Sequence, residues 1–166
     1  MKLKNFLISS MLILSLVLFI GCASDGSSKT SNVPDATKGE PQWWLNMKGP
    51  AYQVLVYSFA DSDGDGFGDF QGLISKLDYL NDGNPETTTD LGVELLWLSP
   101  IHPAASYHGY DVKDYMAVNP QYGTMADFEQ LILECANRNI KVILDLVFNH
   151  SSTSHPWFEA MVADPT

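Results

Sequence analysis

An acidic loop at residues 61–69, DSDGDGFGD, has the residue types and the spacing of a cation site. Asp61, Asp63 and Asp65 place carboxylates at every second position, and Asp69 follows them. The glycines between them let the backbone curl around one centre. Hard oxygen ligands at this spacing suit calcium. We therefore expect a Ca²⁺ site in this loop.

Two other interpretations of the acidic loop stay open. An EF-hand begins with the same D-x-D-x-D-G pattern, but it needs a bidentate glutamate at the twelfth position, where this chain has Gly72. The segment before the loop also has the apolar character of a strand. The second alternative is a solvated acidic turn that binds no ion.

A second cluster, SYHGYDV at residues 106–112, combines aromatic rings with glycine and a carboxylate. Such a set could form a site in which a flat ring stacks on a sugar face while polar neighbours bind the sugar hydroxyls. Packing is the commoner role of a single tyrosine. The position of the cluster, in the loop that follows the second predicted strand, favours a functional role.

A third cluster consists of Asp145, Asn149 and His150. These side chains could ligate a metal or bind a substrate hydroxyl, and structural hydrogen bonding is an equally open interpretation. The sequence contains no glycine-rich phosphate loop after a strand, no His-Glu-x-x-His motif and no Gly-x-Ser-x-Gly motif.

The clusters are positioned by alternating strands and helices. Three apolar runs predict strands, and the third, IKVILDLV, hardly alternates with polar residues, so we expect it to be covered on both faces. Thr124 and Asp127 could cap a helix that Asn139 ends. This order predicts an α/β fold with parallel pairing. The expected strands are 52–59, 93–98 and 140–147, and the expected helices are 124–138 and one through Leu73, Leu77 and Leu80.

The N-terminal segment differs in composition from the rest. Residues 1–21 combine Lys2 and Lys4 with a mostly apolar stretch, which predicts an export signal. Residues 22–42 are rich in Ser, Asp, Gly, Pro and Lys, and we expect a disordered tether. The domain proper is then 43–166.

The charge and the cysteines exclude several classes of protein. The formal net charge is −11 over 166 residues, which argues against nucleic acid as a partner. Cys135 lies on the apolar face of a predicted helix, which indicates a core residue. Cys22 is the only other cysteine, so no disulfide framework is expected.

Together these segments resemble the N-terminal part of the alpha-amylase family of glycoside hydrolases. The resemblance rests on four motifs in order: YQVLVYSFADSDGDGFGDFQGL, LGVELLWLSPI, SYHGYDVKDY and IKVILDLVFNH. It implies a (β/α)₈ barrel of the TIM type, of which this chain holds the first three β/α units and stops at the start of an inserted domain. It also implies hydrolysis of α-1,4-glucosidic bonds in starch-like glucans or maltooligosaccharides.

The resemblance also implies roles for individual residues. Tyr110 resembles the tyrosine that stacks on the sugar to be cleaved, and His150 the histidine that bonds its hydroxymethyl group. Asp145 resembles the aspartate that supports the catalytic centre, and His108 is a secondary candidate beside the glucan. Asn149 resembles a ligand of the calcium that joins the barrel to the inserted domain. A calcium loop of some members is matched by the side chains of Asp61, Asp63, Asp65 and Asp69 with the Phe67 carbonyl.

The sequence LFIGC at residues 18–22 resembles a bacterial lipoprotein cleavage box, which implies lipidation of Cys22. We therefore expect an exported protein with a lipid anchor in the cell membrane, an uncleaved anchor or ordinary secretion being the alternatives.

The catalytic pair of the family is not expected in this chain. The retaining mechanism uses two carboxylates about 5 Å apart, which members take from strands four and five. We therefore expect the chain alone to be inactive and not to fold stably. A surface glucan-binding lipoprotein without catalysis is the rival hypothesis, and a pure calcium-binding module is the third.

Overall fold

The computed structural model describes residues 43–165, all within the compact unit Asn32–Thr166. The predictions for the export signal, the tether and Cys22 concern residues outside this range. Across the range that is described, no helix has both the length and the apolar character that a membrane span requires.

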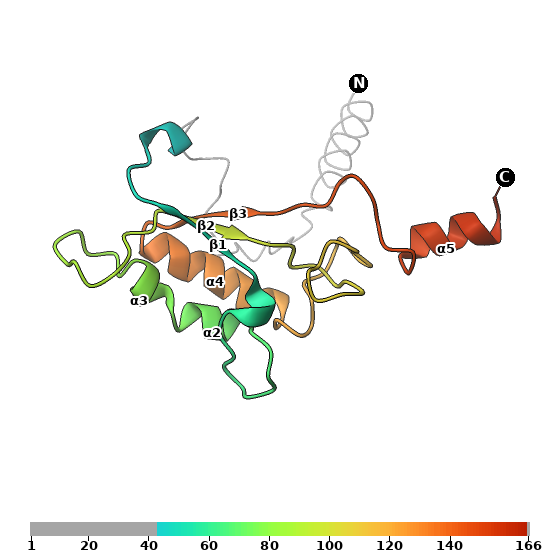
Figure 1. Ribbon diagram of the computed structural model, residues 1–166, viewed down its shortest axis with the longest axis horizontal. Helices are drawn as coiled ribbons and strands as arrows, with labels where there is room; N and C mark the ends of the chain where they lie inside the picture. Colours follow the sequence, from blue (N-terminus) through green and yellow to red (C-terminus); the bar gives the residue numbers. More distant parts are fainter. Residues whose placement is uncertain (1–42, 166) are drawn as a thin grey trace, which may run out of the picture. The chain divides into compact units, whose positions relative to one another are not determined.

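Three parallel strands form the sheet, in the order β1 (Ala51–Val54), β2 (Leu95–Leu98) and β3 (Lys141–Leu144). The register aligns the last residues of the three strands with one another, so their carboxyl ends lie at one edge of the sheet. Figure 1 shows the strands side by side, with a helix between consecutive strands along the chain. This arrangement confirms the predicted parallel α/β fold.

The first strand is shorter than predicted because the acidic loop folds back onto it. The backbone N–H of Gly68 donates to the carbonyl of Tyr57 at 2.7 Å, and that of Asp69 donates to Ala60 at 3.0 Å. A Cβ at position 68 would collide with the Val56 carbonyl oxygen, so only glycine permits this approach. The chain after β1 therefore forms a short 3₁₀ turn, η3 (Val56–Ser58).

The helix between β2 and β3 matches its prediction closely. Thr124 and Asp127 form the expected capping box, in which each side chain accepts from the backbone N–H of the other residue. Asn139 has a φ of 59°, the left-handed conformation expected after the helix end. The remaining bounds are α4 (Met125–Asn137), α5 (Pro156–Ala163) and η2 (Trp43–Asn46).

The helix predicted after the acidic loop is divided in two, α2 (Phe70–Ile74) and α3 (Leu77–Leu80). The Ser75 hydroxyl donates to the Gly72 carbonyl at 2.6 Å, and the Lys76 N–H turns to the Leu73 carbonyl, three residues back. These bonds close α2 with a tighter turn.

One face of the sheet packs on α2, α3 and α4 (Figure 1), and α4 contacts both α2 and β3. Alternate strand residues point into this layer, where Leu96 and Leu98 are fully buried. Cys135 joins the same core, as predicted, and burial raises the pKa of its thiol to about 12.

The prediction that the third strand is covered on both faces was wrong for the described residues. Ile143 is 37% exposed and Leu146 43%. Trp97 is the register partner of Ile143 on β2 and is 39% exposed. The helices supply one layer only, and strand residues alternate between the two faces, so every second side chain in this sheet lacks a covering layer in the described range.

Candidate functional site

The three clusters follow the three strands, so the parallel sheet brings them to its carboxyl edge. Backbone hydrogen bonds join neighbouring strands at this edge. The Ser99 N–H donates to the Val54 carbonyl and the Asp145 N–H donates to the Leu98 carbonyl, each at 2.9 Å. Such an edge is where active sites of parallel α/β proteins are built. Two surface pockets in the described part of the chain lie instead around Glu94 and Asn139, which directly precede β2 and β3. No residue of the three clusters lines either pocket.

Tyr110 and Asp145 join the second cluster to the third. The Tyr110 hydroxyl donates to Asp145 Oδ2 at 2.6 Å. This bond raises the pKa of Tyr110, as do partial burial and the negative charge of Asp145. The phenol is therefore neutral and acts as a donor at physiological pH. The Tyr110 side chain is 39% exposed, so part of it is open to solvent while the hydroxyl is tied down.

His150 makes a second connection between these clusters. Its Nε2 lies 3.1 Å from the Tyr110 carbonyl oxygen. A carbonyl only accepts, so this nitrogen carries a proton and donates. The other ring nitrogen lies 3.2 Å from Nδ2 of Asn149. His150 and Asn149 are both exposed, at the same edge of the sheet as Tyr110.

The loop that carries Tyr110 contains a network of its own. The Ser106 hydroxyl lies 2.7 Å from Asp111 Oδ1 and 2.7 Å from His108 Nε2. The Tyr110 backbone N–H donates to His108 Nδ1 at 3.1 Å. Burial raises the pKa of Asp111, but the hydrogen bonds from the Ser106 side chain and from backbone N–H groups outweigh it and hold the pKa below its ordinary value. Asp111 is therefore a carboxylate at neutral pH.

Tyr115 anchors the segment after β3, and sequence reasoning gave it no role. Its hydroxyl lies 2.8 Å from the carbonyl oxygen of Val147 and 2.7 Å from that of His150. Its ring stacks on Trp157 and contacts His155, which caps α5. In the sequence, only the position of Tyr115 just after the second cluster pointed to a role. Ser106 was quoted within that cluster but was likewise given no role.

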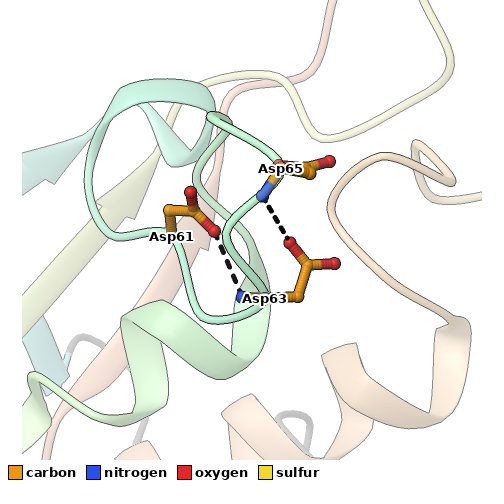
Figure 2. Close-up of side chains that lie close together, drawn as sticks. All are labelled: Asp61, Asp63 and Asp65. Carbon is orange, nitrogen blue, oxygen red and sulfur yellow. Dashed lines mark hydrogen bonds between the residues drawn. The ribbon is translucent and has the colours of Figure 1, made fainter.

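The acidic loop brings Asp61, Asp63 and Asp65 together, with one carboxylate oxygen of each within 4.8 Å of the others. Figure 2 shows two of the bonds that shape the loop, from the Asp63 N–H to Asp61 and from the Asp65 N–H to Asp63, each 3.1 Å long. Gly64 and Gly66 have φ of 85° and 93°, which only glycine adopts without strain. Their N–H groups donate to Asp61 and lower the pKa of that carboxyl.

The other predicted metal ligands lie outside this trio. Asp69 caps α2, accepting from the N–H of Gly72 at 2.6 Å, and also binds the Ser62 hydroxyl and N–H. Asn149 belongs to the cluster after β3. Because β1 and a 3₁₀ turn precede the loop, the helix–loop–helix arrangement of an EF-hand is absent from this part of the described chain.

The donor set of the acidic loop fits a hard cation. Oxygens bound to one Ca²⁺ at about 2.3–2.6 Å lie within about 5 Å of one another, and the three aspartates meet that limit. All three are exposed, so their carboxylates are accessible to an ion. The same geometry is compatible with a solvated turn, because exposed acidic groups commonly lack an ion.

Comparisons with known proteins agree on one family. The family model described as alpha amylase, catalytic domain, matches residues 53–166. The chain is 48% identical to alpha-amylase SusG of Bacteroides thetaiotaomicron over 93% of this chain and 23% of the relative. It is 57% identical to alpha-amylase 3 of Dictyoglomus thermophilum, over 64% and 20%.

A solved structure gives the same result. The alpha-amylase from H. orenii aligns with a TM-score of 0.70 at 56% identity, over 71% of this chain and 24% of that one. The chain thus spans between a fifth and a quarter of the length of the relatives it matches.

Proposed function

The chain belongs to the alpha-amylase family of catalytic domains, and on that premise we propose that it forms the glucan-side part of an enzyme that hydrolyses α-1,4-glucosidic bonds in starch-like glucans. The observation that carries the proposal is the meeting of Tyr110, Asp145 and His150 at the carboxyl edge of the sheet. The names of the relatives, both alpha-amylases, support the substrate class.

Tyr110 is the proposed platform for the sugar ring. Its hydroxyl is fixed by Asp145 and its backbone by His108 and His150, so the plane of the ring is defined before substrate binds. A partly exposed ring held in this way offers an apolar face to a sugar without a large loss of side-chain entropy on binding.

His150 is proposed to hydrogen-bond the hydroxyl of the sugar's hydroxymethyl group. The ring is exposed, and its Nε2–H, which donates to the Tyr110 carbonyl, is the group that such a hydroxyl would share or take over.

Asp145 is proposed to support the centre rather than attack the substrate. Its Oδ2 is engaged by the Tyr110 hydroxyl, which orients both groups. Retaining glycoside hydrolysis uses two other carboxylates, a nucleophile and an acid/base, about 5 Å apart. We accordingly propose that the 166-residue chain alone does not hydrolyse glucan.

Calcium is the proposed ion of the acidic loop. Asp61, Asp63 and Asp65 would be its carboxylate ligands. The family resemblance, rather than the geometry of this trio, adds Asp69 and the Phe67 carbonyl to the proposed set. Asn149 is proposed as a ligand of a separate calcium. When bound, the ion in the loop would neutralise clustered charge and stiffen the turn between β1 and α2.

We also propose that the protein is exported and anchored to the cell membrane through a lipid on Cys22. The basic and apolar order of residues 1–21 supports this proposal. Mass spectrometry of the mature N-terminus should find a lipid-modified Cys22. An unmodified Cys22, or an N-terminus that still carries residues 1–21, would count against the lipid anchor.

The test of the proposed function uses the protein in its complete natural reading frame with starch and maltooligosaccharides. Tyr110→Ala should lower kcat/KM by about tenfold, the size of one aromatic contact of about 1.4 kcal/mol. Tyr79→Ala is the matched control, since Tyr79 is exposed on α3. Glucan binding without hydrolysis would favour the rival, a glucan-binding lipoprotein. Neither binding nor hydrolysis would reject both.

A further inference from the structure

The hydrogen bonds around Ser106 and His108 determine which of their side-chain atoms carry a proton. Asp111 is ionised, so it can only accept, and the 2.7 Å contact must use the proton of the Ser106 hydroxyl. The Ser106 oxygen then has lone pairs left and no second proton. His108 Nε2, 2.7 Å away, must therefore carry the proton of that bond.

The other nitrogen of His108 is equally determined. The Tyr110 backbone N–H points at His108 Nδ1 over 3.1 Å, and a backbone N–H can only donate. Nδ1 must therefore be an unprotonated acceptor. The two contacts together require the neutral imidazole with its single proton on Nε2.

Both ring nitrogens of His108 are thus used within the loop, by Ser106 and by the Tyr110 backbone. The ring also contacts two tyrosine rings, with centroids 5.5 Å from Tyr107 and 5.9 Å from Tyr110. Its effect on the candidate site is thus exerted through Tyr110, whose backbone it holds.

We propose that Ser106 is a positioning residue that locks His108 in the neutral Nε2–H form, and that His108 in turn orients Tyr110. The Asp111 carboxylate orients the serine hydroxyl, the serine orients the imidazole, and the imidazole holds the backbone N–H of Tyr110. The role as a positioning group for a sugar platform rests on the proposed function. The protonation state does not, because it follows from the contacts alone.

The backbone around this relay keeps its members at fixed separations. The Gly109 N–H donates to the Ser106 carbonyl at 3.2 Å, and the Ser106 N–H donates to Asp111 Oδ1 at 3.1 Å. Gly109 has a φ of 79° and is buried against Pro100. The loop is therefore closed by backbone bonds, and loss of the serine hydroxyl removes its two bonds, to Asp111 and to His108, without opening the turn.

The test reads the protonation of His108 directly, by ring-nitrogen NMR of the protein in its complete natural reading frame with isotope-labelled histidine. His108→Gln identifies the signal. At a mildly alkaline pH, above the ordinary histidine pKa of about 6.5, we expect a single state with a protonated Nε2 and an unprotonated Nδ1. A protonated Nδ1, or a mixture of tautomers, would overturn the proposal.

The variants separate positioning from general structure. Ser106→Ala should convert the single state of His108 to a mixture and shift the Tyr110 amide signal, whereas Ser106→Thr should restore both because it keeps the hydroxyl. Ser154→Ala, at an exposed serine, is the matched control. If Ser106→Ala leaves the His108 state and the Tyr110 amide unchanged, Ser106 is not the positioning residue. A protein that fails to bind glucan yet passes these tests would contradict the proposed function alone.

Discussion

The Tyr110 hydroxyl donates a 2.6 Å hydrogen bond to Asp145, although 35 residues separate the two along the chain. The bond joins the loop after β2 to the end of β3, and it places a partly exposed ring beside a carboxylate. The proposals for the site depend on this contact more than on any other.

Asp145→Ala should lower the pKa of Tyr110 toward its ordinary value, because the hydrogen bond and the negative charge of Asp145 both raise it. The stabilisation that this bond contributes is fully present below the unfolded pKa of about 10, and it is lost as the pH rises through the raised folded pKa. Site-specific NMR of labelled tyrosine during an alkaline titration measures the change. Asp114→Ala is the control, and equal Tyr110 titration in both variants would contradict the assignment.

Asp63→Ala should weaken calcium binding by more than about tenfold, since even residues that only support metal ligands contribute that much. Calorimetric titration with Ca²⁺ after removal of bound metal by a chelator gives the affinity. Glu129→Ala removes one exposed negative charge on α4 and serves as the control. Unchanged affinity in Asp63→Ala would show that the acidic loop is a solvated turn.

Thr124→Ala should reduce the free energy of unfolding by about 1 kcal/mol, because the threonine side chain satisfies a backbone N–H at the start of α4 and takes part in the capping box. Urea denaturation followed by circular dichroism measures the loss. Thr89→Ala alters an exposed threonine outside any helix and should be nearly neutral. An equal loss of unfolding free energy in the two variants would show that the cap does not stabilise the protein.

Leu96→Ala and Trp97→Ala test which face of the sheet is covered, since the two residues are neighbours on β2. Leu96 is fully buried under the helices, and its truncation should cost about 2–5 kcal/mol. Trp97 is 39% exposed among the described residues, so its truncation should cost less despite its larger side chain. Chemical denaturation compares them. A larger loss for Trp97→Ala would mean that the second face is packed.

The sequence by itself determined the local structure and the order of the elements. The capping box of Thr124 and Asp127, the left-handed Asn139 and the apolar face with Cys135 all depend on residues a few positions apart, so their spacing carries the information. The three clusters could also be placed at one edge of the sheet, because parallel strands bring their carboxyl ends together.

Only the tertiary structure decided which side chains meet. The Tyr110–Asp145 bond and the bonds of the Tyr115 hydroxyl join segments more than thirty residues apart, and the Ser106–His108–Asp111 relay depends on how one loop closes. The exposure of Trp97 and Ile143 was missed for the same reason. An apolar strand has the same sequence whether one of its faces or both are packed, and the layers laid against the sheet settle the difference.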